Sequence, residues 1–147
     1  MARILSKDQE KSVMNAIKEA ENNTSGEVRV HLEDRCKSGD PIKRAIEMFG
    51  ELNMHETELR NGVIVYVAIK DHQIAVWGDE GIHTKVGQDF WNDALELMQK
   101  YFRADDYETG LSEAILMIGD KLKENFPYQS DDENELSDDI SYGDTNA

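Results

Sequence analysis

The chain has 147 residues, enough for one domain with a hydrophobic core, and its 31 acidic and 16 basic residues give it a net charge of −15. A charge of this sign repels nucleic acid and anionic lipid and attracts metal cations or basic proteins, so we expect no nucleic-acid partner. The single cysteine, Cys36, excludes an intramolecular disulfide, and no apolar run approaches the length that spans a bilayer. We therefore expect a cytoplasmic monomer without membrane insertion.

The first two predicted elements are a helix and a strand. Ser6 and Gln9 have the spacing of a capping box, which predicts a helix from about Lys7. Residues 27–33 then alternate polar and apolar side chains, which predicts a strand near a sheet edge with one solvent-exposed face. That exposed face would carry Glu27, Arg29, His31 and Glu33.

A second helix is predicted from residue 41. Asp40 suits the N-cap and Pro41 suits the first helical position. Apolar residues then recur at helical spacing and predict the buried face of this helix: Ile42, Ala45, Ile46, Phe49 and Leu52. A polar loop over 53–60 follows.

The centre of the sequence predicts a β-hairpin. Seven consecutive apolar residues, 63–69, are typical of a strand that is buried on both faces. Four polar residues separate this run from a second β-rich run, 74–77. If Ile69 pairs with Ile74, Gly81 lies opposite Gly62. Three polar residues would then gather at one end of the sheet: Asn61, Asp79 and Glu80.

The remaining chain predicts a loop over 82–86, a third helix over about 87–102 and a fourth helix that Asp105 and Glu108 open at capping-box spacing. The element order predicts an α/β fold: a three-layer α/β/α sandwich with a small mixed sheet, a central β-hairpin and about four amphipathic helices. This folded domain occupies 1–129. Residues 130–147 carry seven acids and no base, so we expect a disordered acidic tail that aids solubility or docks onto a basic partner.

Four stretches of the sequence, in this order and spacing, resemble the TPM domain family: SGEVRVHLED, ELRNGVIVYVAIKDHQIAVWGDEGI, GQDFW and FRADDYETGL. The resemblance covers roughly residues 5–127, and the tail is similar to that of a soluble, stand-alone bacterial subgroup. It implies an α/β/α sandwich that binds a divalent cation, calcium above all, in acidic loops at one end of the sheet. A plant member is associated with acid phosphatase activity, whereas other members act as assembly or modulator proteins.

Mapped onto this sequence, the resemblance gives a set of metal-ligand candidates: Asn61, Asp79, Glu80, Asp105 and Asp106, with Glu33 and Asp34 as weaker additions. Calcium takes six to eight oxygen ligands, and magnesium also prefers oxygen. The chain has no EF-hand pattern, so a site must be assembled from separate segments. A structural interpretation stays open, in which Asp105 is an N-cap and Asp106 is favoured by the helix dipole.

The direction of the third helix decides whether these acids meet. If it runs straight back along the sheet, Asp105 and Asp106 arrive at the end opposite Asp79. They meet Asp79 only if residues 80–86 first carry the chain to the other end. The sequence leaves both arrangements open.

The leading functional hypothesis is a binding or modulator module whose loops are ordered by a divalent cation, with an unidentified protein partner. The alternative is a metal-dependent acid phosphatase that acts on phosphomonoesters, in which the metal polarises the phosphoryl group and Arg60 or Arg103 holds it. The sequence assigns no catalytic residue. The four histidines lie in different segments, which argues against a zinc site.

Overall fold

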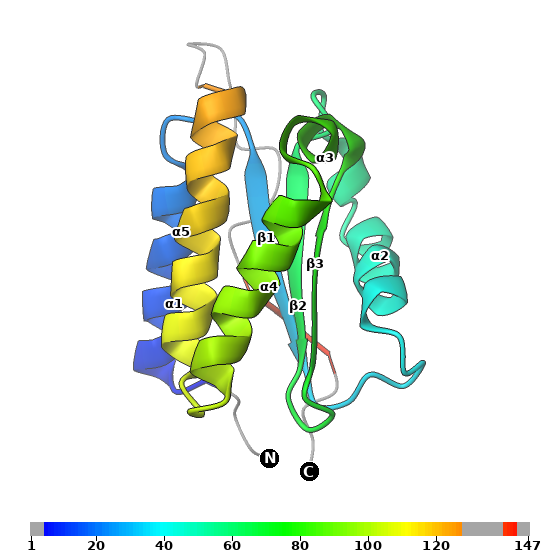
Figure 1. The fold of residues 1–147 in the computed structure, drawn as a ribbon, viewed down its shortest axis with the longest axis vertical. Helices are drawn as coiled ribbons and strands as arrows, with labels where there is room; N and C mark the ends of the chain where they lie inside the picture. The colour runs from blue at the N-terminus through cyan, green and yellow to red at the C-terminus, as the bar shows by residue number, and fades with distance from the viewer. Residues whose placement is uncertain (1–4, 128–139, 144–147) are drawn as a thin grey trace.

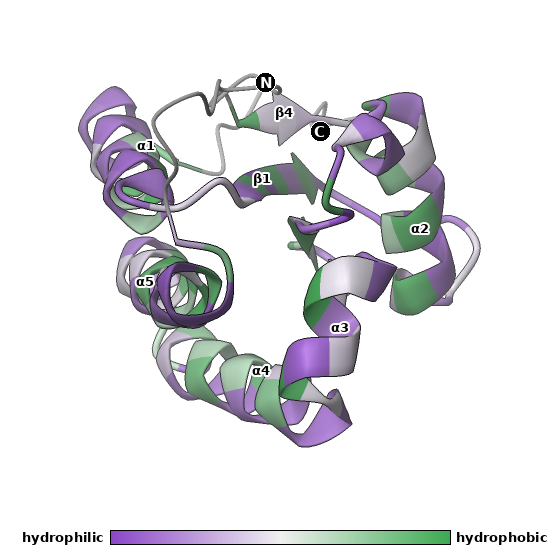
Figure 2. Cartoon of the chain, turned by 90° about the horizontal axis from the view of Figure 1, so that it is seen from above, coloured by the Kyte–Doolittle hydropathy of each residue, from purple (hydrophilic) through white to green (hydrophobic). Residues whose placement is uncertain are grey.

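A four-stranded mixed sheet lies between two layers of helices in the computed structural model, which describes residues 5–127 and 140–143. The elements in chain order are α1 (Lys7–Glu21), β1 (Glu27–Glu33), α2 (Pro41–Glu51), the short 3₁₀-helix η1 (Met54–Glu56), β2 (Gly62–Ala68), β3 (Gln73–Gly78), α3 (Glu80–Val86), α4 (Gln88–Phe102), α5 (Tyr107–Asn125) and β4 (Ser141–Tyr142). Helices α1, α4 and α5 cover one face of the sheet, and α2 covers the other (Figures 1 and 2). This confirms the predicted α/β/α sandwich.

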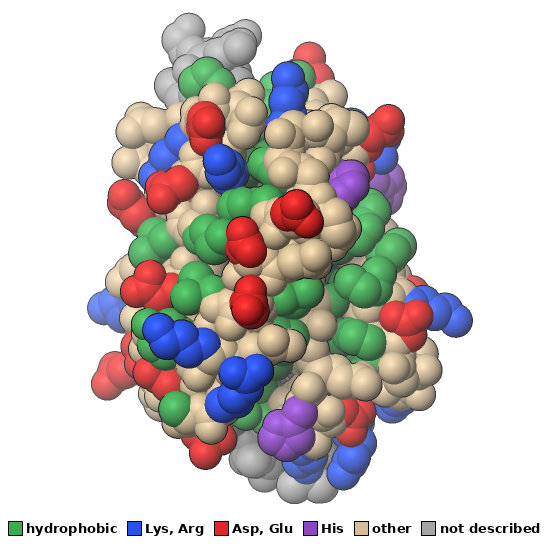
Figure 3. Space-filling model, viewed as in Figure 1, with side chains coloured by type: hydrophobic (Ala, Val, Ile, Leu, Met, Phe, Trp, Pro, Cys, Tyr) green, Lys and Arg blue, Asp and Glu red, His purple; other side chains and the backbone are tan. Residues whose placement is uncertain are grey.

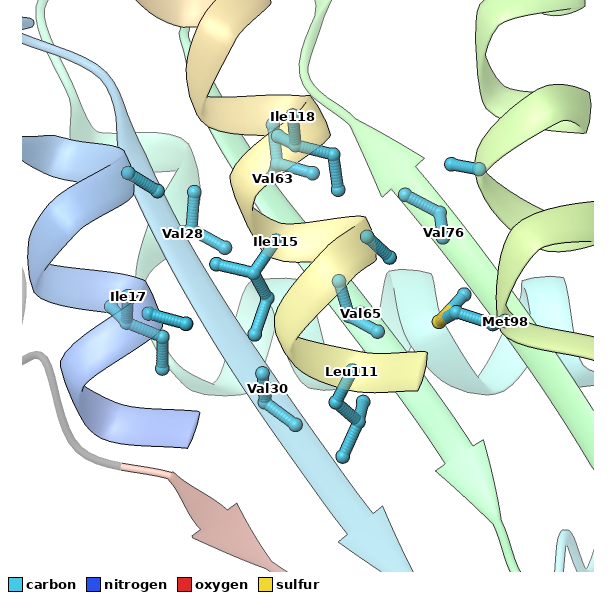
Figure 4. Close-up of a cluster of buried hydrophobic side chains, with 14 of the residues drawn as sticks. Ile17, Val28, Val30, Val63, Val65, Val76, Met98, Leu111, Ile115 and Ile118 are labelled. Atoms are coloured by element: carbon cyan, nitrogen blue, oxygen red, sulfur yellow. The ribbon is translucent and has the colours of Figure 1, made fainter. Parts of the chain in front are cut away.

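The strand order is β3-β2-β1-β4. Strand β2 is parallel to β1 and antiparallel to β3, and β4 is parallel to β1. All seven residues of β2 are buried, as the apolar run predicts. Its alternate side chains enter two cores: Val63, Val65 and Val67 pack in the core beneath α1, α4 and α5 (Figure 4), and Ile64, Tyr66 and Ala68 pack beneath α2.

The hairpin register differs from the prediction by two residues. Ala68 pairs with Gln73, so Asp79, and not Gly81, lies opposite Gly62. The turn therefore consists of residues 69–72, with a left-handed backbone at the last of them (φ 54°). The amide of His72 donates to the carbonyl of Ile69 at 3.3 Å and closes this turn.

The predicted solvent-exposed face of β1 was wrong, because all seven residues of this strand are buried. Helix α2 covers the polar face, and β4 occupies the outer edge (Figure 2). The tail prediction was also wrong in part. Ile140 is buried in the main core, and residues 141–142 pair with β1, because β1 offers a hydrogen-bonding edge and the core offers an apolar site. Residues 130–139 and 144–147 lie outside the described residues.

Helix α2 begins as predicted, with the Asp40 carboxylate accepting from the amide of Lys43. Its buried residues are Ala45, Met48 and Phe49. Ile42 and Ile46, expected in the core, are 43% and 44% exposed. In the described part of the chain, α2 is the only α-helix on its face of the sheet, and the short helix η1 beside it adds Met54 to the same core. The side of α2 that carries Ile42 and Ile46 therefore has no neighbouring helix to cover it.

The other helices agree with the sequence-based predictions, with two differences. Residues 80–86, expected as a loop, form α3, so residues 5–127 contain five α-helices where about four were expected. The N-cap of α5 is Asp106, whose carboxylate accepts from the amide of Thr109, and Asp105 precedes it with a left-handed backbone (φ 59°). None of the described helices combines the length and apolarity needed to cross a bilayer.

Candidate functional site

The seven predicted metal ligands lie in three separate places. Asn61, Asp79 and Glu80 lie where β2 begins and β3 ends; Glu33 and Asp34 lie at the carboxyl end of β1; Asp105 and Asp106 lie between α4 and α5. Helix α3 stays at the end of the sheet where β3 stops, and α4 then runs back along the sheet (Figure 1). Asp105 and Asp106 therefore arrive at the opposite end from Asp79.

A small cavity marks that opposite end. Its volume is about 230 Å³, and it lies between the hairpin turn and the α4–α5 loop. Ile69 and His72 line it from the turn, and Arg103 and Tyr107 line it from the loop. This position rules out a single site built from Asp79 together with Asp105 and Asp106.

Asp79 is fully buried and forms an ion pair with the side chain of Arg60. Its two carboxylate oxygens accept from Nε and Nη2 of Arg60 at 2.7 and 2.8 Å, and one of them also accepts from the amide of Glu80 as the N-cap of α3. The carboxylate raises the pKa of Arg60 through these hydrogen bonds. A metal ion at Asp79 would have to displace Arg60. The neighbouring Asn61 is buried and donates to the hydroxyl of Ser25.

Glu33 is the centre of a buried polar network on the α2 side of the sheet. Its carboxylate accepts from Nε and Nη2 of Arg44, both at 3.0 Å, and from the hydroxyl of Tyr66. His31 Nε2 lies 3.2 Å from the same carboxylate. Burial raises the pKa of Glu33, but the hydrogen bonds from Arg44, Tyr66 and His31 outweigh it and hold the pKa below 4.5. Glu33 is therefore ionised and already neutralised.

The network continues into the tail strand. Burial lowers the pKa of His31 and outweighs the opposite effect of Glu33, so the ring is neutral at pH 7. An ionised carboxylate only accepts, so Nε2 of His31 carries the proton and Nδ1 is left as an acceptor. The hydroxyl of Ser141 lies 2.9 Å from Nδ1, and 3.2 Å from the carbonyl of Val30. This chain of contacts ties β4 to β1.

Asp34 is also paired. Its carboxylate lies 3.3 Å from Nζ of Lys70, and its carbonyl accepts from the amide of the same residue in the hairpin turn. Three of the seven candidates, Asp79, Glu33 and Asp34, thus have a basic side chain at ion-pair distance.

Asp105 and Asp106 differ from these three. Across residues 5–127 and 140–143, no lysine, arginine or histidine forms an ion pair with either of them. One oxygen of Asp106 caps α5, and Asp105 is exposed. Both follow the last turn of α4, where the helix dipole favours a cation. The described residues contain no cluster of three or more acidic, histidine or cysteine side chains that could hold a metal ion.

Sequence reasoning missed the partners of these acids. Arg44, Tyr66 and Ser141 enter the Glu33 network from three other elements, and Arg60 pairs with Asp79 across the hairpin. One signal was available, since His31 and Glu33 are two residues apart in a strand and must share a face. The other contacts join residues far apart in the sequence and carry no local signal.

The sequence and structure of the chain were compared with known protein families and solved structures. A model of the TPM domain matches residues 1–121. The solution structure of the BA42 protein from the psychrophilic bacterium Bizionia argentinensis is similar to this chain at 39% identity, with a TM-score of 0.89 and coverage of 97% of this chain and 98% of that one. A search of curated proteins found no match.

Two more distant solution structures share the fold. The N-terminal domain of the cg2496 protein from Corynebacterium glutamicum has 11% identity, a TM-score of 0.67 and coverage of 90% of this chain and 84% of that one. The N-terminal domain of a protein from P. gingivalis has 15% identity, a TM-score of 0.72 and coverage of 86% and 83%. Because the family match covers most of its length, the chain belongs to the TPM domain family.

Proposed function

We propose that this TPM domain binds one divalent cation, calcium with magnesium as a weaker competitor, at the α4–α5 loop, and that it acts as a binding module whose loop the ion orders. The observation that carries the proposal is that Asp105 and Asp106 lack an ion-pair partner among the described residues. They are adjacent, and no basic side chain among the described residues neutralises either of them. A cytoplasmic location and a protein partner are parts of the same proposal.

The chemistry of the loop suits a hard cation of modest affinity. Asp105 supplies a carboxylate, and Asp106 supplies the oxygen that does not cap α5. The carbonyls at the end of α4 lie at the negative end of the helix dipole and add oxygen ligands, as does water. Two carboxylates are few for calcium, so we expect a Kd of about 10⁻⁴ to 10⁻³ M, the range of weak sites.

A calcium titration of the full chain, followed by residue-resolved NMR, tests this proposal. We expect saturable shifts confined to residues 101–109 and a smaller response to magnesium. Asp105→Asn should abolish these shifts. Asp120→Asn is the matched control, because it removes the same charge from an exposed position of α5 away from the loop and should leave the titration unchanged. Shifts spread over all acidic residues, or unaffected by Asp105→Asn, would mean counterion attraction only and would overturn the proposal.

The second candidate function is metal-dependent hydrolysis of a phosphomonoester. The observation that favours it is the position of Arg103, which lies on the same loop and lines the cavity of about 230 Å³. Arg60 is less suited, because its guanidinium is engaged by Asp79. Calcium-dependent turnover of a generic phosphomonoester that is lost in both Asp105→Asn and Arg103→Gln would support this function. Turnover retained in both variants would contradict it.

A further inference from the structure

We propose that the outer edge of β3 is a docking site for an extended, uncharged segment of a basic partner protein, which adds to the sheet as a further strand. The two edges of the sheet differ. The β1 edge is covered by the chain's own strand β4, whereas no strand in the described part of the chain pairs with the outer edge of β3. The proposal does not depend on the cation site, because it uses other residues.

The hydrogen-bond pattern leaves three residues of β3 with their backbone groups directed outward. In an antiparallel pair, opposite residues alternate between hydrogen-bonded and non-hydrogen-bonded positions. The amide of Asp79 donates to the carbonyl of Gly62 at 2.9 Å, so residues 73, 75 and 77 also bond to β2. The amides and carbonyls of Ile74, Val76 and Gly78 therefore face the open edge. None of them has a backbone partner within the described residues.

Strand β3 lacks the usual protection of an edge strand. Edge strands in soluble proteins normally carry lysine, proline or a bulge that prevents pairing with another chain. The residues of β3, QIAVWG, contain no charge and no proline, although charged residues make up 32% of the whole chain. An unpaired edge of this composition is a template for strand addition. Of the three outward-facing residues, Ile74 is half-buried, and Val76 and Gly78 are buried between the flanking helices.

Apolar and amide side chains flank the middle of this edge, and charged side chains lie at its two ends, Arg60, Asp79 and Glu80 at one and Arg103 at the other. On one side, Ile42 and Ile46 of α2 are 43% and 44% exposed. On the other side, Gln88 and Gln99 of α4 line the two cavities at the ends of the edge, and Asn92 lies between them and accepts from Gln88. In Figure 3, apolar side chains gather on the side of the molecule between α4 and α2.

Cavities lie at both ends of β3. The larger, of about 610 Å³, lies between α2 and α3, with Val76, Trp77 and Gly78 of β3 in its wall. The smaller, of about 230 Å³, includes Gln73 and Ile74. Together they provide room for the side chains of an added strand, which project alternately toward α2 and toward α4.

The charge distribution selects the occupant. Strand β3 itself carries no charge, and the charged residues of the groove lie at its two ends: Arg60, Asp79 and Glu80 at one end and Arg103 at the other. The centre of the segment that pairs with β3 must therefore be uncharged, because a buried, unpaired charge is costly. The chain as a whole carries a net charge of −15, which repels a second copy of this chain and attracts a basic protein. Apolar or hydroxyl side chains in the segment, with basic residues on either side of it, meet both requirements.

A synthetic peptide provides the probe: alternating valine and threonine, flanked by lysines. The full chain is titrated with it in EDTA and again in calcium, and amide hydrogen exchange is followed by NMR. We expect the amides of Ile74, Val76 and Gly78, which have no backbone acceptor among the described residues, to exchange more slowly with the peptide than in the free chain. Those of Ala75 and Trp77 should be protected throughout. Binding in EDTA separates this proposal from the cation site.

Two controls sharpen the test. Ile46→Lys should weaken peptide binding about tenfold, because it removes apolar contact and adds repulsion, whereas Asn15→Lys on α1 makes the same charge change elsewhere and should have no effect. A peptide with proline at its centre should not bind. Equal binding of the two peptides, or equal affinity of the Ile46→Lys and Asn15→Lys variants for the probe peptide, would overturn the proposal. Protection of amides at the β1 edge would overturn it as well. Protection of β3 that appears with protein concentration alone would identify a second copy as the occupant and would also overturn it.

Discussion

The guanidinium of Arg60 and the fully buried carboxylate of Asp79 form two hydrogen bonds, at 2.7 and 2.8 Å, across the end of the hairpin. The same carboxylate begins α3 by accepting from the amide of Glu80. Asp79 thus fixes the direction in which the chain leaves the sheet. One of the predicted metal ligands thus has a structural role in this position.

Substitutions at Asp79 should separate its two contributions. Asp79→Asn keeps an N-cap for α3 but removes the charge that Arg60 needs, whereas Asp79→Ala removes both. We expect both variants to be destabilised, with Asp79→Ala lower by about a further 1 kcal/mol, the usual contribution of a cap. Urea unfolding measures the difference. Equal stabilities of the two variants would show that the cap contributes nothing.

The His31–Glu33 pair predicts a loss of stability in acid. The folded-state pKa of His31 lies below its ordinary value of 6.5, so the unfolded chain binds the proton more readily. The contribution of His31 is therefore complete above pH 6.5 and is lost as the pH falls through its folded-state pKa. The pKa of Glu33 is also lowered, so a second loss begins below pH 4.5.

Thermal unfolding at a series of pH values tests this prediction. Wild-type stability should decline between pH 6.5 and 5. His31→Gln keeps hydrogen-bonding groups but cannot titrate, so its decline over the same range should be shallower. An unchanged slope in the variant would assign the acid sensitivity to other groups. His55 is exposed, and His55→Gln is the matched control that should keep the wild-type slope.

Gly143 should be required for the attachment of β4. Its amide donates to the carbonyl of Leu32 at 2.7 Å, and a Cβ added to it would lie 2.7 Å from Cβ of Glu33. We expect Gly143→Val to release the tail, which should speed hydrogen exchange at Gly143 and leave β2 and β3 protected. Tyr142→Phe is the control that should keep the strand. Unchanged exchange in Gly143→Val would show that Glu33 moves aside.

Two glycines in helices should respond oppositely to alanine. A Cβ on Gly119 of α5 would lie 2.6 Å from the Cα of Ala20 in α1, so Gly119→Ala should push these helices apart and cost about 1 to 3 kcal/mol. Gly50 in α2 has open space around it, so Gly50→Ala should stabilise the chain by up to about 1 kcal/mol. Urea unfolding of both variants checks the signs. A stabilising Gly119→Ala would contradict close packing of α1 and α5.

Elements governed by neighbouring residues were predictable. The capping box of Ser6 and Gln9 is present with both hydrogen bonds, and Asp40 with Pro41 begins α2 as expected. The apolar run of β2 is buried on both faces. Each of these signals acts within about four residues, so the sequence alone contains the whole interaction.

The register of the hairpin and the cap of α5 show the limit of such signals. A four-residue turn was predicted, but its position was wrong by one residue in each strand, because the turn closes between Ile69 and His72. Asp105 and Asp106 both suited the N-cap, and the choice of Asp106 depends on how the chain leaves α4. Local chemistry allowed either arrangement in both cases.

The sequence by itself determined the layers of this protein: where α1, α2, α4 and α5 lie, which strand is central and which acidic residues could attract a cation. Only the tertiary structure decided which of those acids are neutralised. Glu33 meets Tyr66 across 33 positions, and His31 meets Ser141 across 110. Contacts between residues so far apart in the sequence depend on how whole helices and strands pack. A buried charge without a partner is costly, so a fold that buries these groups must also place a partner beside them.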